Sequence, residues 1–165
     1  MQSSGPASQG RGPSPDDVAL VRQVAATDHN WAVVATTRRD GSVQATIVTA
    51  GVMDHPQGGQ PTVAFVARGG TVKLRNLRRD PRMTVVFRAG REWVTVEGRV
   101  SLIGPDDLPG GYQPSAVPQL LRDVFTAAGG THDNWPEYDR VMAAERRTAI
   151  FVEMHRVYSN PNRPR

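Results

Sequence analysis

The chain has 165 residues, enough for one domain with its own core and too few for two. Its formal charge of +4 is carried almost entirely by arginine, and it is compatible with an anionic small molecule, an acidic segment or nucleic acid as partner. The chain contains no Cys, which excludes disulfides, thiolate nucleophiles and Cys-ligated metal centres.

The N-terminal residues 1–14 are rich in Gly, Ser, Pro and Gln and lack the apolar stretch of a signal peptide, so we expect a disordered tail. No later run reaches the length of a membrane span, and we expect a cytoplasmic protein with no membrane contact. Ser14 and Pro15, followed by two acids, are typical of a helix start. We expect this helix to end between residues 27 and 30.

Two runs rich in β-branched residues, 31–37 and 42–50, flank the sequence Arg38-Arg39-Asp40-Gly41. An Asp-Gly pair between such runs predicts an antiparallel hairpin. A turn-rich loop over 54–61 then leads into a third strand at 62–67. Residues 70–81 predict a short helix that ends at Asp80-Pro81, because proline disfavours the helical conformation in the residue before it.

The second half of the chain begins with two more strands, at 82–87 and 93–103. Gly98 predicts a bend or bulge in the longer one, which is long enough to change sheets. Helical spacing covers 114–128 and 135–147, and we expect these helices over an opening or edge of the β structure.

Residues 148–158 predict a last strand, and 161–165 form a polar tail. The apolar residues, 38% of the chain, occur in short runs among many Gly and Pro, which favours β structure with accessory helices. Five or six strands in consecutive hairpins, with one short helix after the third, predict a mainly β fold. We expect a six-stranded antiparallel split β-barrel that forms a single domain over 15–160.

Lys73 is the only lysine of the chain, and it lies where the third strand gives way to the short helix. Helix N-termini attract anions, and Thr71, Lys73, Arg75 and Asn76 together offer a hydroxyl, two cations and an amide. A solvated basic helix explains the same residues equally well. The strand 45–49 could lay its backbone beside a flat ring, or it could be an ordinary sheet strand.

Several chemistries lack their motifs in this sequence. The four histidines are far apart without ligand-like spacing, and we expect no metal. A nucleophile elbow, a dinucleotide-binding glycine motif and a P-loop are all missing. The basic residues are not interleaved with aromatics, and we expect no nucleic-acid partner. The three tryptophans, Trp31, Trp93 and Trp135, are more typical of a core or an interface than of a stacking platform.

Four segments, in this order, resemble the split β-barrel flavin and deazaflavin oxidoreductases related to pyridoxamine 5′-phosphate oxidase. They are the Asp40-Gly41 hairpin, Thr71-x-Lys73-x-x-Asn76-Leu77-x-x-Asp80-Pro81, Val96-Glu97-Gly98-Arg99-Val100, and Trp135-x-x-Tyr138-Asp139-Arg140 with Glu145-Arg146-Arg147 and Val157-Tyr158. The closing segment looks most like the branch that uses coenzyme F420. The resemblance implies a homodimer with two cofactor sites at its interface.

The resemblance further implies a function and a set of binding residues. Lys73, with Thr71, Arg75 and Arg68, would hold the cofactor phosphate, Asn76 would support the loop, and Thr46, Ile47, Val48 and Thr49 would run along the ring. Exposed arginines at 38, 39, 78 and 79 are candidates for an acidic cofactor tail. The expected function is hydride transfer from reduced F420 to an unsaturated small molecule, with no catalytic side chain. The alternatives are an FMN-dependent enzyme similar to pyridoxamine 5′-phosphate oxidase and a non-enzymatic cofactor- or tetrapyrrole-binding barrel.

Overall fold

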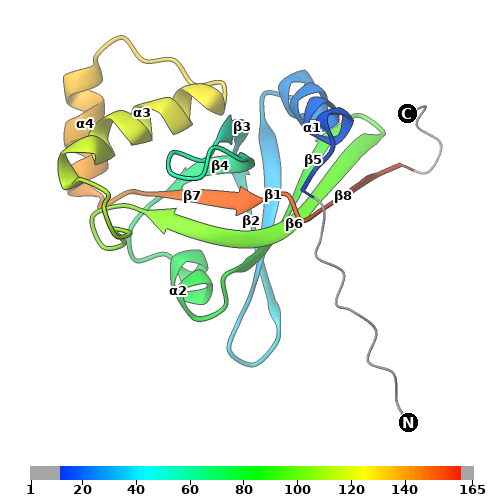
Figure 1. The fold of residues 1–165 in the computed structure, drawn as a ribbon, viewed down its shortest axis with the longest axis horizontal. Coiled ribbons are helices and arrows are strands. Elements are labelled where there is room, and N and C mark those ends of the chain that lie inside the picture. The colour runs from blue at the N-terminus through cyan, green and yellow to red at the C-terminus, as the bar shows by residue number, and fades with distance from the viewer. Residues whose placement is uncertain (1–11, 161–165) are drawn as a thin grey trace.

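The computed structural model describes residues 12–160 (Figure 1). Most of the predicted N-terminal tail and all of the C-terminal tail lie outside the described residues. The helices are α1 (Pro15–Thr27), α2 (Val72–Arg79), α3 (Val117–Ala127) and α4 (Trp135–Ala144). The strands are β1 (Trp31–Thr37), β2 (Val43–Thr49), β3 (Gly51–Asp54), β4 (Pro61–Ala67), β5 (Arg82–Ala89), β6 (Glu92–Ile103), β7 (Thr148–Glu153) and β8 (Arg156–Ser159).

Local sequence signals explain how the first elements begin and turn. Ser14 Oγ accepts a hydrogen bond from the Asp17 N–H at 3.1 Å, and the Asp17 carboxylate accepts one from the Ser14 N–H, so a capping box opens α1. The β1–β2 turn has Gly41 at a φ of +86°, a conformation that glycine adopts without steric cost. Both the predicted helix start and the predicted hairpin are therefore confirmed.

The strands form one antiparallel sheet in the order β2-β1-β5-β6-β7-β4-β3, with β8 paired to β6. Only Ala50 separates β2 from β3, so one bent segment supplies both ends of this order. β7 and β8 likewise form an interrupted segment along β6. With each of these pairs counted as one strand, the wall has six strands, and the predicted mainly β split barrel is confirmed.

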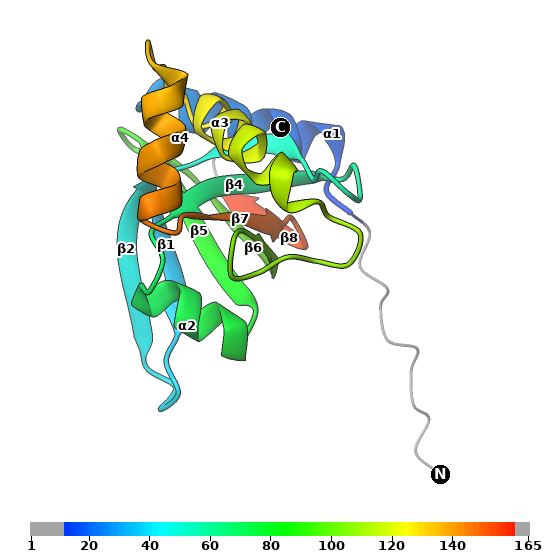
Figure 2. The same ribbon diagram turned by 90° about the vertical axis from the view of Figure 1, so that its left-hand side faces the viewer.

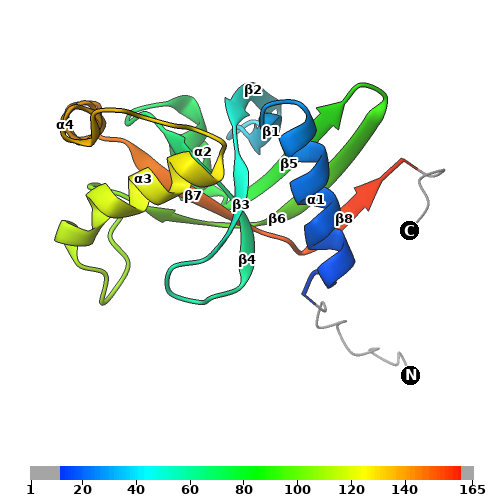
Figure 3. The same ribbon diagram turned by 90° about the horizontal axis from the view of Figure 1, so that it is seen from above.

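Two apolar cores hold the barrel together. The larger core fills the barrel interior and includes Val24 of α1, Phe65, Leu74 of α2 and Phe87. The smaller core joins α3 and α4 to the outer face of β4 and β7. Figures 1 and 3 place α1, α3 and α4 on one side of the barrel and α2 on the opposite side. None of the helices within 12–160 is long and apolar enough to cross a membrane.

Gly98 lies where β6 changes partners. Residues up to Glu97 pair with β8, whereas Val100 and those beyond it pair with β7. A Cβ at position 98 would lie 1.6 Å from the Glu153 carbonyl oxygen, so only glycine allows the two backbones to approach this closely. The predicted bend and change of partner at Gly98 are confirmed.

The structure corrects three element boundaries. Residues 51–54, just before the expected loop, form the strand β3 because they pair with β4. The last strand is interrupted at residues 154–155, where the His155 N–H bonds to the carbonyls of both Glu97 and Glu153 at 3.1 Å. The helix predicted over 135–147 is α4, which ends at Ala144, before Arg146 adopts a φ of +49°. The two predicted helices pack on the outer face of the wall.

Candidate functional site

A cleft opens where β2 leaves the barrel wall. Among the described strands β2 pairs only with β1, while its continuation β3 pairs with β4, so the outer edge of β2 separates from β4. Figure 2 shows β2 at the margin of the barrel. The cleft has a volume of about 360 Å³ and is lined by Ile47, Val48, Thr49, Val66, Val124, Phe125, Ala128, Tyr138, Met142 and Arg147.

The predicted ring-binding strand therefore borders this cleft. Because side chains alternate along a strand, Ile47 and Thr49 lie on the outer face of β2 and are exposed, whereas Thr46 and Val48 face the other way and are partly buried. The Ile47 side chain is 66% exposed. The edge of β2 that faces away from β1 keeps its backbone N–H and C=O groups free of strand pairing within the described chain.

The wall of the cleft is mostly apolar. Tyr138 is buried there, and its hydroxyl donates a hydrogen bond to the Leu121 carbonyl at 3.1 Å. Burial raises the pKa of Tyr138 to about 12. The phenol therefore stays neutral at physiological pH, and its proton is already engaged. Arg147 is the one charged residue of this lining.

The anion site predicted from the sequence falls at the N-terminus of α2. Thr71 occupies the N-cap position in an extended conformation, but its hydroxyl makes no capping hydrogen bond. Three buried side-chain hydroxyls within 12–160 have no hydrogen-bond partner, and two of them belong to Thr46 and Thr71. Buried hydroxyls are normally satisfied, so Thr46 on β2 and Thr71 before α2 have hydrogen-bonding capacity to offer; the third such hydroxyl belongs to Thr148 of β7.

The Lys73 side chain is half-buried and makes no hydrogen bond or ion pair with any described residue. Burial, and then the neighbouring charge of Arg147, lower the pKa of Lys73 below its usual value. Arg147 connects α2 to the cleft, because it also lines the cleft. Its Nε donates to Glu145 at 2.6 Å, so Glu145 compensates Arg147 while Lys73 lacks a counter-ion. A bound anion would supply that counter-ion.

Other residues of the predicted set lie apart from Lys73. Arg75 is exposed, and two residues correspond to about 200° around a helix, so it points away from Lys73. Asn76 is buried and its amide donates to Thr36 Oγ1 at 3.0 Å, which ties α2 to β1. Arg68 is exposed at the end of β4.

Three of the four arginines expected to meet an acidic cofactor tail have partners among the described residues. Arg78 makes a two-point ion pair with Asp107 at 3.0 and 2.7 Å. Arg79 donates to the Thr37 carbonyl, and Arg38 donates to the Val43 carbonyl at 2.7 Å. Arg39 makes no such contact with the described residues.

Sequence reasoning did not assign a binding role to Arg147 or Tyr138, although both lie in segments quoted for the family resemblance. Their signal was spacing within the closing Trp-x-x-Tyr and Glu-Arg-Arg segment, which carries no information about distance to Lys73. Residues 12–160 contain no group of three or more His, Asp or Glu that could hold a metal ion.

The described residues thus combine a split barrel with a cleft at the free edge of β2 and a half-buried lysine at the start of α2. The sequence pattern of the family described as pyridoxamine 5′-phosphate oxidase matches residues 20–158. The chain therefore belongs to the pyridoxamine 5′-phosphate oxidase family. This family binds flavin-type cofactors and includes oxidoreductases.

Solved structures share this fold at low sequence identity. A conserved hypothetical protein from Mycobacterium tuberculosis is 17% identical with a TM-score of 0.61, over 94% of this chain and 89% of that one. A pyridoxamine 5′-phosphate oxidase-related, FMN-binding protein from Nostoc punctiforme is 13% identical with a TM-score of 0.60, over 90% and 84%. A protein named F420 reductase is 15% identical with a TM-score of 0.57, over 88% and 98%.

Proposed function

We propose that this protein is an F420-dependent oxidoreductase that transfers a hydride from the reduced deazaflavin to an unsaturated small-molecule acceptor. The observation that carries the proposal is Lys73, a half-buried cation without a counter-ion at the N-terminus of α2, next to the cleft residue Arg147. An ammonium group that has lost part of its hydration is stabilised by a phosphate at this position.

The residues around Lys73 fit a phosphate. The unpartnered hydroxyl of Thr71 can donate to a phosphate oxygen, and the first N–H groups of α2 have no partners within the helix. Lys73 and Arg147 add positive charge. Arg75 and Asn76 are left out of this set because one points to solvent and the other is bound to Thr36.

The cleft fits a flat ring system. The free edge of β2 offers backbone donors and acceptors, Ile47 and Val48 offer apolar surface, and Phe125 and Met142 form the opposite wall. About 360 Å³ is at the low end of the range for ligand pockets, so much of a flavin-sized cofactor would lie at the open rim.

A second copy of the chain would close that rim, and we propose a homodimer. The outer face of β1 and β2 carries apolar side chains that are unusually exposed: Trp31 by 50%, Val33 by 42%, Val43 by 64% and Ile47 by 66%. Val33 and Ile47 are directly opposite each other in the strand register, so they form one surface. Trp31 was expected in a core or an interface, and its exposure in the single chain favours an interface. Contiguous apolar patches of this kind mark interfaces.

The bound cofactor supplies the hydride, and the chain supplies orientation and exclusion of water. Lys73 and Thr71 would fix the phosphate end, and the edge of β2 would fix the ring. Tyr138 would hold the cleft wall in place through Leu121 rather than donate a proton, since burial keeps its pKa near 12. No side chain is assigned to a chemical step.

F420 is favoured over FMN by the closing segment, with its Trp135-x-x-Tyr138 and Glu145-Arg146-Arg147, and by the similarity to the F420 reductase structure. FMN is the second candidate, favoured by the FMN-binding neighbour from Nostoc punctiforme. Both cofactors carry a phosphate, so the anion site does not distinguish them.

The test is titration of the purified protein with oxidised F420, in which quenching of the cofactor fluorescence measures binding. We expect saturable binding that Lys73→Ala weakens about tenfold or more, because a charge-assisted contact is lost. Arg75→Ala is the matched control on the same helix, and we expect it to leave affinity unchanged. Equal losses in the two variants would show that only the general positive charge matters.

Reconstitution separates the two cofactors. If F420 does not bind but FMN gives a stable yellow complex that Lys73→Ala weakens, the FMN alternative replaces the proposal. If neither cofactor binds saturably, the oxidoreductase assignment fails. Turnover is then measured with a panel of conjugated acceptors and reduced cofactor, and absence of any cofactor oxidation would favour a binding protein over an enzyme.

A further inference from the structure

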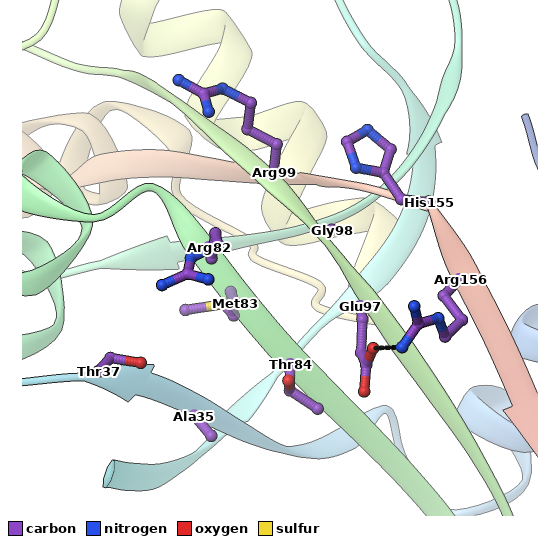
Figure 4. Close-up of a pocket in the computed structure, with 10 residues that line it drawn as sticks. All are labelled: Ala35, Thr37, Arg82, Met83, Thr84, Glu97, Gly98, Arg99, His155 and Arg156. Atoms are coloured by element: carbon purple, nitrogen blue, oxygen red, sulfur yellow. Dashed lines mark hydrogen bonds and ion pairs between the residues drawn. The ribbon is translucent and has the colours of Figure 1, made fainter. Parts of the chain in front are cut away.

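A second concave region lies on the outer face of the sheet formed by β1, β5, β6 and β8 (Figure 4). We call it the arginine furrow. Its volume is about 590 Å³, and it shares no lining residue with the cleft. The residues that line it are Ala35, Thr37, Arg82, Met83, Thr84, Glu97, Gly98, Arg99, His155 and Arg156.

Two arginines occupy neighbouring strands at one end of the arginine furrow. Arg82 of β5 and Arg99 of β6 are opposite in the strand register, and both are exposed. Like charges directly opposite on neighbouring strands are destabilising. Arg82 makes a two-point ion pair with Asp80 at 2.8 and 2.7 Å, but the Arg99 side chain makes no hydrogen bond or ion pair with the described residues.

Asp80 is the carboxylate that pairs with Arg82 at this end of the furrow. The hydrogen bond from Arg82, and then the charges of Arg82, Arg79 and Arg99, lower the pKa of Asp80. One negative charge is therefore surrounded by three guanidinium groups. Arg79 lies in the last turn of α2, where a cation is stabilised by the helix dipole, and it also donates to the Thr37 carbonyl. Arg99 comes from β6, so the helix dipole does not explain its position.

The one carboxylate among the lining residues, Glu97, is engaged by other groups. Glu97 accepts hydrogen bonds from Arg156 at 3.1 Å and from the Tyr158 hydroxyl at 2.7 Å. Figure 4 shows Arg156 turned toward Glu97, with Arg99 and Arg82 further along the furrow. The floor between them is made of small residues such as Ala35, Thr84 and Gly98, which leave room for a ligand.

We propose that the arginine furrow binds a small polyanion that carries two or more adjacent phosphate or carboxylate groups, with Arg99 and Arg82 as its main contacts. Guanidinium groups present paired N–H donors that match both kinds of anion, and a ligand with two negative charges would offset the like charges of these neighbouring arginines. The assignment rests on the charges of this face alone and does not depend on the cofactor cleft.

The first experiment is calorimetric titration of the full-length protein, in its native oligomeric state, with inorganic pyrophosphate. We expect saturable binding that Arg99→Gln weakens about fivefold or more. Arg88→Gln is the matched control, because Arg88 is an exposed arginine on the same face of β5. Equal affinity in the wild type and Arg99→Gln, or equal losses in both variants, would overturn the proposal.

Two more variants separate this site from the cleft and test the sign of the charge effect. Lys73→Ala should retain pyrophosphate binding, and complete loss there would assign the anion to α2 and overturn the furrow. Asp80→Asn should tighten binding, because it removes the competing carboxylate. Citrate in place of pyrophosphate distinguishes the ligand classes: tighter citrate binding indicates a polycarboxylate, and tighter pyrophosphate binding indicates a phosphate compound.

Discussion

Replacing Lys73 with Met should stabilise the ligand-free protein while weakening its affinity for a phosphate-bearing cofactor. Met keeps most of the length of the lysine side chain but removes the charge. In the folded protein the ammonium is half-buried, lies near Arg147 and has no counter-ion among the described residues. The charge is therefore more costly in the folded state than in the unfolded state, where it is fully hydrated.

The size of the effect follows from the partial burial. A fully buried lysine can shift its pKa by several units, each worth about 1.4 kcal/mol, but a half-exposed group keeps much of its hydration, and about 1 kcal/mol is a reasonable expectation. For a chain of this length that corresponds to a rise in Tm of roughly 2–4 °C. The measurement is thermal unfolding in phosphate-free buffer at pH 7, with Arg75→Met as the exposed control that should leave Tm nearly unchanged.

The pH dependence identifies the cause. Because burial and Arg147 lower the folded-state pKa of Lys73, wild-type stability should rise as the pH increases from this lowered value to the unfolded pKa of about 10.4, where the group is neutral in both states. The advantage of Lys73→Met should shrink over that window. Since Lys73 is the only lysine, ¹³C-labelled lysine gives one side-chain signal, and its titration reports this pKa directly. A Tm lowered by the substitution, or a pKa of Lys73 at or above 10.4, would refute the reasoning.

Three further predictions concern the barrel. Gly98→Ala should lower the free energy of unfolding by about 2–4 kcal/mol in urea titrations, because the new Cβ would meet the Glu153 carbonyl oxygen; a loss below about 0.5 kcal/mol would contradict the close approach. Burial lowers the pKa of His55, so wild-type stability should fall relative to His55→Gln as the pH drops below about 6.5, and parallel stability–pH curves would count against this. Asn76→Ala should cost about 1–3 kcal/mol because it leaves the buried Thr36 hydroxyl without the Asn76 donor, and chemical denaturation checks this against Arg75→Ala.

The elements with local signals were predictable from the sequence. The Ser14 cap, the Asp40-Gly41 turn and the proline after α2 each act within a few residues, and the structure confirms all three elements. β3 was missed because only its pairing with β4 defines it, and because the Gly51 at its start weakens any strand pattern. At Gly51 a Cβ would clash with the Ala127 carbonyl, which is a long-range contact that no local pattern reveals.

The candidate site shows the same division. Thr71 and Lys73 could be proposed from the sequence because a strand followed by a helix N-terminus is a local signal for an anion. Arg75 was included for its charge and proximity in sequence, but helix rotation separates it from Lys73. Arg147 could not be assigned, since its effect on Lys73 depends on how β7 and α2 meet across the barrel.

The two proposed anion sites follow different physical logic, and this difference explains the single lysine. In the arginine furrow the charges are exposed, so planar guanidinium groups lose little hydration and gain paired contacts. At α2 the cation is half-buried beside Arg147, and both conditions disfavour the charged form and lower the pKa of Lys73. A lysine can lose its proton as its pKa falls, whereas an arginine stays charged at every physiological pH. Lys73→Arg should therefore lower the free energy of unfolding of the ligand-free protein by more than it reduces the free energy of phosphate binding. A larger loss in binding than in unfolding would remove this reason for a lysine at the site.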